Sequence, residues 1–155
     1  MDERQEIQYK YIPHRVIAEE YIENIAGDLY DYKFYCFNGV PEYIQLIIGR
    51  HGESKAAFFD LDWNIVEFNS VHFGEMHRAP AKPKQLDKAI EIARILSEGF
   101  PFVRVDLYLI GDDTIYFGEM TFTPSDGMID WVPKSADRML GEKIILPVED
   151  KKYCG

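Results

Sequence analysis

Short apolar runs that end at turn residues recur along the chain and predict a protein rich in β-strands. Four of them are long enough for full strands: residues 32–37, 43–48, 102–110 and 114–122. Asn38-Gly39 separates the first two runs, and this dipeptide is typical of tight β-hairpins. Gly111-Asp112-Asp113 separates the last two. The pattern therefore predicts two β-hairpins.

Weaker patterns add to this sheet. Residues 16–22 are predicted to form a strand that runs into a loop, and residues 55–61 and 65–68 a further short pair. Residues 72–84 contain two prolines and are predicted to be irregular.

One segment has helical periodicity. Apolar residues recur at helical spacing at Leu86, Ala89, Ile90, Ala93 and Leu96. They predict an amphipathic helix over residues 85–98, which Gly99 and Pro101 end. A short helix is also expected near residues 136–140. The predicted fold class is α+β, mainly an antiparallel sheet with one long helix.

The second hairpin carries the candidate chemistry. Side chains alternate along a strand, so Arg104 and Asp106 share one face. If residues 112–113 centre the turn, Asp106 lies opposite Glu119 and Arg104 lies opposite Thr121. A bulge or a different loop would shift this register.

Two carboxylates directly opposite each other on a sheet repel, so a cation is expected between Asp106 and Glu119. Carboxylate oxygens with a hydroxyl nearby suit Mg²⁺ better than zinc. Arg104 on the same face suits a phosphate. Removing one carboxylate charge is then expected to relieve repulsion in the protein without ligand. The alternative is a solvated outer face whose charges have no ligand.

Composition narrows the function classes. The formal net charge of −10 argues against a nucleic-acid-binding protein, because phosphate backbones need a basic surface. No apolar run approaches the roughly 18 residues of a membrane span, and the polar amino terminus resembles no targeting signal. Cys36 and Cys154 are expected to be reduced thiols. We therefore expect a cytoplasmic protein with no transmembrane segment.

Several stretches together resemble a known family. The Arg-x-Asp motif, followed thirteen residues after its Asp by Glu119, is similar to the metal-binding hairpin of ATP-grasp enzymes. More closely, four stretches resemble the TupA-like ATP-grasp family, which is associated with teichuronopeptide and other cell-surface polymer biosynthesis: residues 31–39, 59–63, 99–108 and 117–124. The resemblance covers nearly the whole chain.

The resemblance implies roles for the residues of the hairpin. Asp106 and Glu119 would hold Mg²⁺, and Arg104 would contact phosphate during catalysis. Thr121 stands where many ATP-grasp enzymes have Asn, so it is a candidate third metal ligand.

The resemblance also implies an ATP site. The backbone of a strand-to-hinge segment would hold adenine, and this segment comprises Glu19, Glu20, Tyr21 and Ile22. Asp31 would meet the ribose and Lys33 a phosphate. For Glu19 and Asp31 the alternative is an exposed charge beside a strand end.

For the whole enzyme, the resemblance implies that ATP phosphorylates a carboxylate-bearing acceptor and that an amine then displaces phosphate. The chain matches only the carboxyl-terminal subdomain of such an enzyme. The Gly-rich loop that covers the phosphates is not evident, because residues 1–30 contain a single glycine, Gly27. An upstream half or a partner is expected to supply that loop, and the uncovered surface is expected to favour self-association.

Two hypotheses of other kinds stay open: a non-catalytic nucleotide-binding remnant and a glycosyltransferase of surface polysaccharide. The second would use Asp60 and Asp62 as a DxD metal motif, although these residues also suit an ordinary turn. His72, Glu75 and His77 lack the spacing of a zinc site and are expected to lie in a polar loop.

Overall fold

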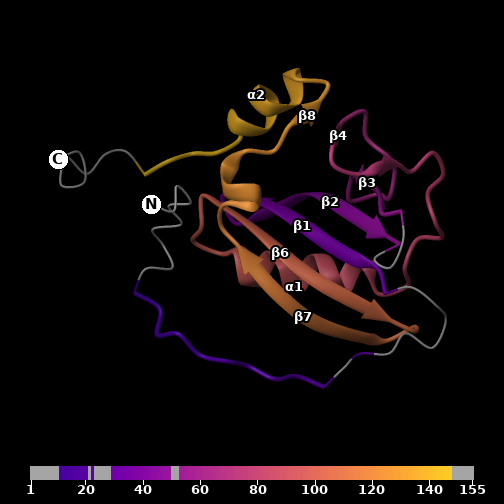
Figure 1. Ribbon diagram of the computed structural model, residues 1–155, viewed down its shortest axis with the longest axis vertical. Coiled ribbons are helices and arrows are strands. Elements are labelled where there is room, and N and C mark those ends of the chain that lie inside the picture. Colours follow the sequence, from indigo (N-terminus) through magenta and orange to yellow (C-terminus); the bar gives the residue numbers. More distant parts are fainter. Residues whose placement is uncertain (1–10, 21, 23–28, 50–52, 148–155) are drawn as a thin grey trace.

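The computed structural model describes residues 11–20, 22, 29–49 and 53–147. Its main element is a six-stranded sheet in the order β5-β3-β2-β1-β6-β7 (Figure 1). The strands are β1 (Asp31–Phe37), β2 (Val40–Ile48), β3 (Lys55–Phe59), β5 (Gly74–Glu75), β6 (Phe102–Ile110) and β7 (Thr114–Thr121). All neighbouring strands pair antiparallel except β3 and β5, which pair parallel.

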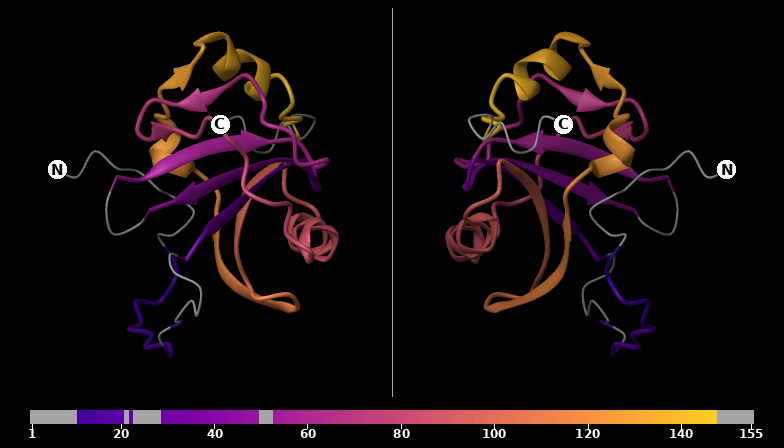
Figure 2. Two further views of the ribbon diagram at one scale, coloured as in Figure 1. Left: turned by 90° about the vertical axis from the view of Figure 1, so that its right-hand side faces the viewer. Right: turned by 90° about the vertical axis from the view of Figure 1, so that its left-hand side faces the viewer.

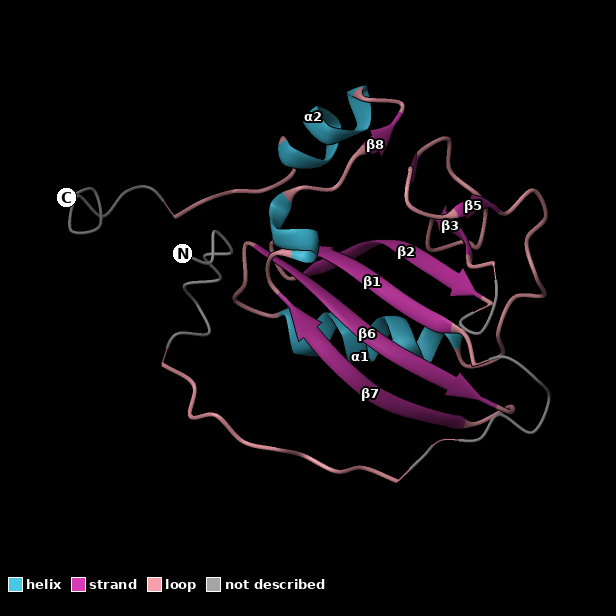
Figure 3. Cartoon of the chain, in the orientation of Figure 1, coloured by secondary structure: helices cyan, strands magenta, loops and turns pink. Residues whose placement is uncertain are grey.

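Helix α1 (Leu86–Ser97) covers one face of the sheet (Figures 1 and 2). The opposite face is covered only at one end (Figure 3). This partial layer consists of β4 (Asn69–Ser70), the 3₁₀ turn η2 (Pro124–Gly127), β8 (Trp131–Val132) and α2 (Ser135–Gly141). The mixed, mostly antiparallel class is as expected. The expected long helix is α1, whose 12 residues are an ordinary length, and the short α2 is the second helix.

Two apolar clusters hold these layers together. The first lies between α1 and the sheet, and its fully buried members include Phe34, Leu46, Leu86, Val105 and Leu107. The second is aromatic and lies between the sheet and the partial layer; it includes Tyr35, Phe37, Phe58, Phe68 and Trp131. Alternation along the strands sends successive side chains to these two clusters, which explains how single strands such as β1 build both faces.

The first predicted hairpin is confirmed. β1 and β2 meet at Asn38 and Gly39, whose φ angles of 52° and 80° lie in the left-handed region that such a turn requires. The predicted helix over residues 85–98 is confirmed as α1, and Gly99 follows it with a φ of 83°. The strands of the second hairpin and the short helix near residues 136–140 are also confirmed.

Two predicted strands are wrong. Residues 16–20 are irregular and exposed, because this short apolar run has no neighbouring strand with which to pair. Residues 65–68 form only an isolated bridge between Ile65 and Phe59. The chain there turns away after Asp60 to begin the partial layer.

The β6–β7 hairpin has a bulge at Gly118. Near the turn, Leu107 lies opposite Phe117, whereas Asp106 lies opposite Glu119, so Gly118 is an extra residue on β7. A Cβ atom on Gly118 would lie 3.0 Å from the carbonyl oxygen of Asp106, so the bulge packs too closely for a larger residue. The predicted pairing of Asp106 with Glu119 is therefore confirmed, but a three-residue loop and a bulge together produce it.

Cys36 is a buried free thiol against α1. Burial raises its pKa to about 12, which keeps the thiol protonated at neutral pH. Cys154 lies outside the described residues. None of the helices in the described part of the chain is long and apolar enough to cross a membrane.

Replacing Gly118 with Ala is expected to lower the free energy of unfolding by about 1–3 kcal/mol, because the new methyl group meets the β6 backbone. Gly141→Ala is the matched control. A Cβ atom at Gly141 would lie in open space, and alanine favours the end of α2, so stability should stay equal or rise slightly. Urea denaturation measures both. Equal stability of the Gly118 variant and the parent would show that the bulge tolerates a side chain.

Candidate active site

Four polar side chains form a row across the sheet, beside the partial layer. Lys33 on β1 pairs in register with Gln45 on β2 and with Asp106 on β6, and Asp106 pairs in turn with Glu119 on β7. A second row lies beside it, in which Arg104 is flanked by Tyr35 and Thr121. Backbone pairing alone therefore brings these side chains together.

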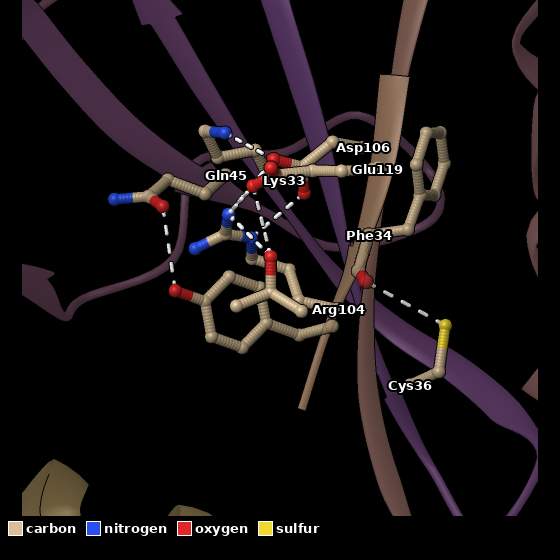
Figure 4. A network of polar contacts seen from close by, with 9 residues as sticks. Lys33, Phe34, Cys36, Gln45, Arg104, Asp106 and Glu119 are labelled. Atoms are coloured by element: carbon tan, nitrogen blue, oxygen red, sulfur yellow. Dashed lines mark hydrogen bonds and ion pairs between the residues drawn. The ribbon is translucent and has the colours of Figure 1, made fainter. Parts of the chain in front are cut away.

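Arg104 joins the two rows. Its Nε donates a hydrogen bond to Asp106 Oδ1 at 2.7 Å and its Nη2 to Asp106 Oδ2 at 2.8 Å (Figure 4). The same Nη2 reaches Glu119 Oε1 and Thr121 Oγ1, each at 2.9 Å. Thr121 Oγ1 also donates to Glu119 Oε1 at 2.9 Å. Lys33 Nζ makes an ion pair with Asp106 Oδ2 from the other side.

These contacts correct one expectation. Asp106 and Glu119 do lie opposite each other, but Arg104 and Lys33 already neutralise their repulsion. Asp106 is 3% exposed, so its charge depends on these two cations. Glu119 has a side chain that is 62% exposed, and solvent stabilises its charge as well. Removing the charge of Asp106 should therefore destabilise the protein rather than relieve it.

The environment shifts two pKa values. Burial opposes the charge of Arg104, but the hydrogen bonds and charge of Asp106 outweigh it, so the pKa of Arg104 lies above its ordinary value. Burial raises the pKa of Tyr35 to about 12, with Arg104 lowering it and Asp106 raising it further. The Tyr35 hydroxyl therefore stays protonated and donates a hydrogen bond to Gln45 Oε1 at 3.3 Å.

Only some of the residues predicted to contact ATP lie at or near the Arg104 cluster. Lys33 lies within the cluster. Asp31 is buried at the start of β1 on the same face as Lys33, so it is not an exposed charge. Glu19 and Glu20 lie in the exposed segment 11–20, which runs separately from the sheet (Figures 1 and 2).

The adenine hinge itself stays a prediction. Ile22 is half-buried in irregular chain, and Tyr21 lies outside the described residues. The described residues do not bring Glu19 or Glu20 to the Arg104 cluster.

Gln45 and Tyr35 are members of the site that the sequence did not single out. Their positions follow from the β1–β2 register, which the Asn38-Gly39 turn sets to within one residue. Counted from that turn, Lys33 would lie opposite Ile44. A register shift between Tyr35 and Cys36 brings Gln45 opposite Lys33 instead, and no sequence signal indicated this shift.

The structure supports a turn at Asp60. Asn64 donates its backbone N–H to Asp60 Oδ1 at 2.8 Å and its side-chain amide to Asp60 Oδ2 at 2.9 Å. Although burial favours the neutral acid, these hydrogen bonds hold the pKa of Asp60 below its ordinary value. Glu75 and His77 are exposed and 3.6 Å apart. Among the described residues, no group of three or more His, Cys, Asp and Glu side chains could hold a metal ion.

A family model described as TupA-like ATPgrasp matches residues 1–145. The chain belongs to the TupA-like ATP-grasp family. Comparison with curated proteins and with solved structures gave no match. ATP-grasp proteins generally bind ATP and Mg²⁺, so the oxygen-rich cluster on β6 and β7 is the place in this TupA-like chain to test for a metal.

The donor set of the TupA-like chain fits Mg²⁺. Magnesium in phosphate-transfer sites is held by one or two carboxylates together with substrate phosphates, rather than by a complete protein cage. Asp106 and Glu119 provide two carboxylates, and the hydroxyl of Thr121 lies beside them. These three residues would hold the ion once Arg104 and Lys33 turn toward an anion.

Replacing Asp106 with Asn is expected to lower the free energy of unfolding by about 3 kcal/mol, because Lys33 and Arg104 would remain mostly buried with one fewer negative charge. Glu119→Gln is expected to cost less than about 1 kcal/mol, as is typical of an exposed ion pair. Glu42→Gln breaks an ion pair elsewhere and serves as the matched control. Urea denaturation measures the stability of the three variants. An Asp106 variant as stable as the parent would contradict the prediction.

Proposed function

We propose that this chain supplies the Mg-ATP-binding part of a carboxylate–amine ligase that acts in cell-surface polymer biosynthesis of the teichuronopeptide kind. The observation that carries the proposal is the row of Lys33, Asp106 and Glu119 with Arg104 beside it, in a chain of an ATP-grasp family. This row combines oxygen ligands for a metal with two cations for phosphate.

The proposed reaction has two steps. A carboxylate oxygen of the acceptor attacks the γ-phosphorus of ATP, the bond from that phosphorus to the bridging oxygen breaks, and ADP leaves. The amine nitrogen then attacks the acyl carbon of the acylphosphate and loses a proton. An amide forms, and inorganic phosphate departs with the former carboxylate oxygen.

The residues of the cluster stabilise charge rather than form bonds to the substrate. Arg104 and Lys33, which strand pairing places beside each other, would turn from Asp106 toward the phosphoryl oxygens and neutralise their charge as they transfer. Mg²⁺ bound to Asp106 and Glu119 would shield the phosphates of ATP from one another and from the incoming carboxylate. The raised pKa of Arg104 keeps its charge constant throughout.

The glycosyltransferase hypothesis is less well supported. Both carboxylate oxygens of Asp60 accept hydrogen bonds from Asn64, so Asp60 contributes to a turn. A non-catalytic nucleotide-binding remnant is the other alternative. It predicts binding of Mg-ATP with no turnover under any condition.

Mg-ATP is expected to raise the melting temperature of the parent protein. Glu119→Gln should weaken Mg-ATP binding by roughly tenfold or more, about 1.4 kcal/mol, because it removes a metal ligand while the fold is kept. Isothermal titration calorimetry measures the affinities. The control replaces Asp60 and Asp62 with Asn and should bind Mg-ATP normally. Full binding by the Glu119 variant would refute the metal site, and selective loss of sugar-nucleotide binding by the control would favour the glycosyltransferase.

Turnover by the chain alone is expected to be negligible. In-line phosphoryl transfer needs the γ-phosphate held from several sides, and we propose that a covering loop comes from a segment or partner outside these 155 residues. The measurement is ADP release with a pool of carboxylate acceptors and amines, with and without an added amino-terminal ATP-grasp half. Amide formation only in its presence supports the ligase. Rapid turnover by the 155-residue chain would show that its phosphate-binding half lies within it.

A further inference from the structure

An aromatic cavity of about 230 Å³ lies between the sheet and the partial layer of η2, β8 and α2. Five aromatic side chains line it: Tyr35, Phe37, Phe102, Phe122 and Trp131. The ring of Tyr35 meets Phe102 and Trp131 edge to face, with ring centroids 6.0 Å and 6.4 Å apart. Phe37 packs against Phe102 at 5.3 Å. These contacts fix the rings in place, so the cavity has rigid aromatic walls.

Helix α2 closes the cavity with one of its faces. Asp137, Leu140 and Gly141 line it, and their spacing of three and four residues places them on the same side of the helix. Leu140 is buried, whereas Asp137 is exposed. The carboxylate of Asp137 makes no ion pair with a described residue, while the next residue, Arg138, pairs with Glu142. The cavity therefore has a negative charge at its solvent-accessible side that no internal cation neutralises.

The charge of the lining excludes anionic ligands. Among the described residues around this cavity, Asp137 is the only charged one. A phosphate or carboxylate would meet a negative charge and no cation, so neither ATP nor a carboxylate acceptor fits here. The faces of aromatic rings attract cations, and the carboxylate of Asp137 adds to this attraction. The lining therefore favours an organic cation with an apolar body.

The volume of the cavity limits that body to about one ring. An engineered apolar cavity of about 150 Å³ binds benzene, whereas sites for drug-sized ligands occupy roughly 300–1,000 Å³. At about 230 Å³, this cavity suits a six-membered ring with a short chain. The chain would allow a terminal ammonium group to reach Asp137 while the ring packs beside Trp131.

We propose that this cavity is a binding site for a small arylalkyl ammonium ion, whose ring packs among the aromatic side chains and whose ammonium group pairs with Asp137. The site is distinct from the Arg104 cluster, because none of the charged residues of that cluster lines it. Tyr35 separates the two, since its ring lines the cavity and its hydroxyl donates to Gln45 in the polar row. The proposal does not rest on ligase activity.

The test compares three probes of similar shape at neutral pH: 2-phenylethylamine, the neutral 2-phenylethanol and the anionic 3-phenylpropionate. NMR titration of the full chain follows the two indole N–H signals. Trp131 lines the cavity and Trp63 belongs to the other apolar cluster, so the amine should shift the signal of Trp131 and leave that of Trp63 unchanged. An unshifted Trp131 signal would overturn the site.

The affinities of the three probes test the charge of the ligand. The neutral probe should bind at least threefold more weakly than the amine, the modest preference that an exposed ion pair provides, and the anionic probe at least tenfold more weakly. A neutral probe bound within threefold of the amine would overturn the assignment to a cation.

Two matched variants test the role of Asp137. Asp137→Asn should weaken binding of 2-phenylethylamine about threefold or more and leave binding of 2-phenylethanol unchanged, because it removes only the charge. Glu142→Gln changes the net charge of the same helix equally but lies outside the cavity lining, so it should bind all three probes as the parent does. An Asp137 variant that keeps the full preference for the amine would contradict the pairing, as would an equal loss in the Glu142 variant.

Gly141→Leu tests the cavity itself. A Cβ atom at Gly141 would lie in open space, and leucine favours a helix, so the variant should fold like the parent. Its side chain should occupy the cavity and weaken binding of 2-phenylethylamine at least tenfold. Binding at parental affinity would overturn the cavity as the site. Mg-ATP binding, measured in the same samples, should be unchanged by all three variants, and its loss in them would show that the two sites are not distinct.

Discussion

A carboxylate that is almost fully buried needs cations beside it, and Asp106 imposes this requirement on the middle of the sheet. Arg104 meets it with two hydrogen bonds from its own strand, and Lys33 meets it from the neighbouring strand. The arrangement holds only in the observed register. On the other side, the bulge at Gly118 places Glu119 rather than Gly118 opposite Asp106. The bulge therefore determines which residue of β7 faces Asp106.

The location of this cluster follows from how the apolar layers are distributed. Helix α1 buries one face of the sheet along β1, β2 and β6, whereas η2, β8 and α2 cover only one end of the other face (Figures 2 and 3). The polar rows begin where the aromatic cluster around Tyr35 and Trp131 ends. Their backbone is thus rigid because of the packed face beneath, while their side chains meet a polar cavity and solvent. Such a border suits a site in which charged ligands must enter and leave.

Local patterns were enough to predict the hairpins and α1. The pairing of Asp106 with Glu119 was predicted from a turn centred on residues 112–113, whereas a three-residue loop and the bulge at Gly118 produce it. What local patterns could not supply is the pairing of β1 with β6, which joins Lys33 to Asp106 across 73 positions of the chain. Without that pairing, the sequence pattern favoured an external cation between the carboxylates, and the internal cations were missed. The polar cavity beside these residues depends on Ser70 and other side chains from the irregular partial layer, where no periodicity exists to guide a prediction. At residues 16–20 the sequence pattern predicted a strand that the structure does not contain, because an apolar run does not form a strand without a partner strand.

Thr121 clarifies how one set of side chains can serve both stability and binding. Its hydroxyl accepts a hydrogen bond from Arg104 and donates one to Glu119. A hydroxyl can rotate its proton. The oxygen of Thr121 could therefore turn a lone pair toward a cation once the carboxylate of Glu119 also turns toward it. The amide that many ATP-grasp enzymes have at this position offers a fixed acceptor instead. The threonine of this chain therefore closes the unliganded cluster by a hydrogen bond to Glu119. In the proposed metal site that hydrogen bond would have to break, and we expect the cost to lower metal affinity in the absence of an anion.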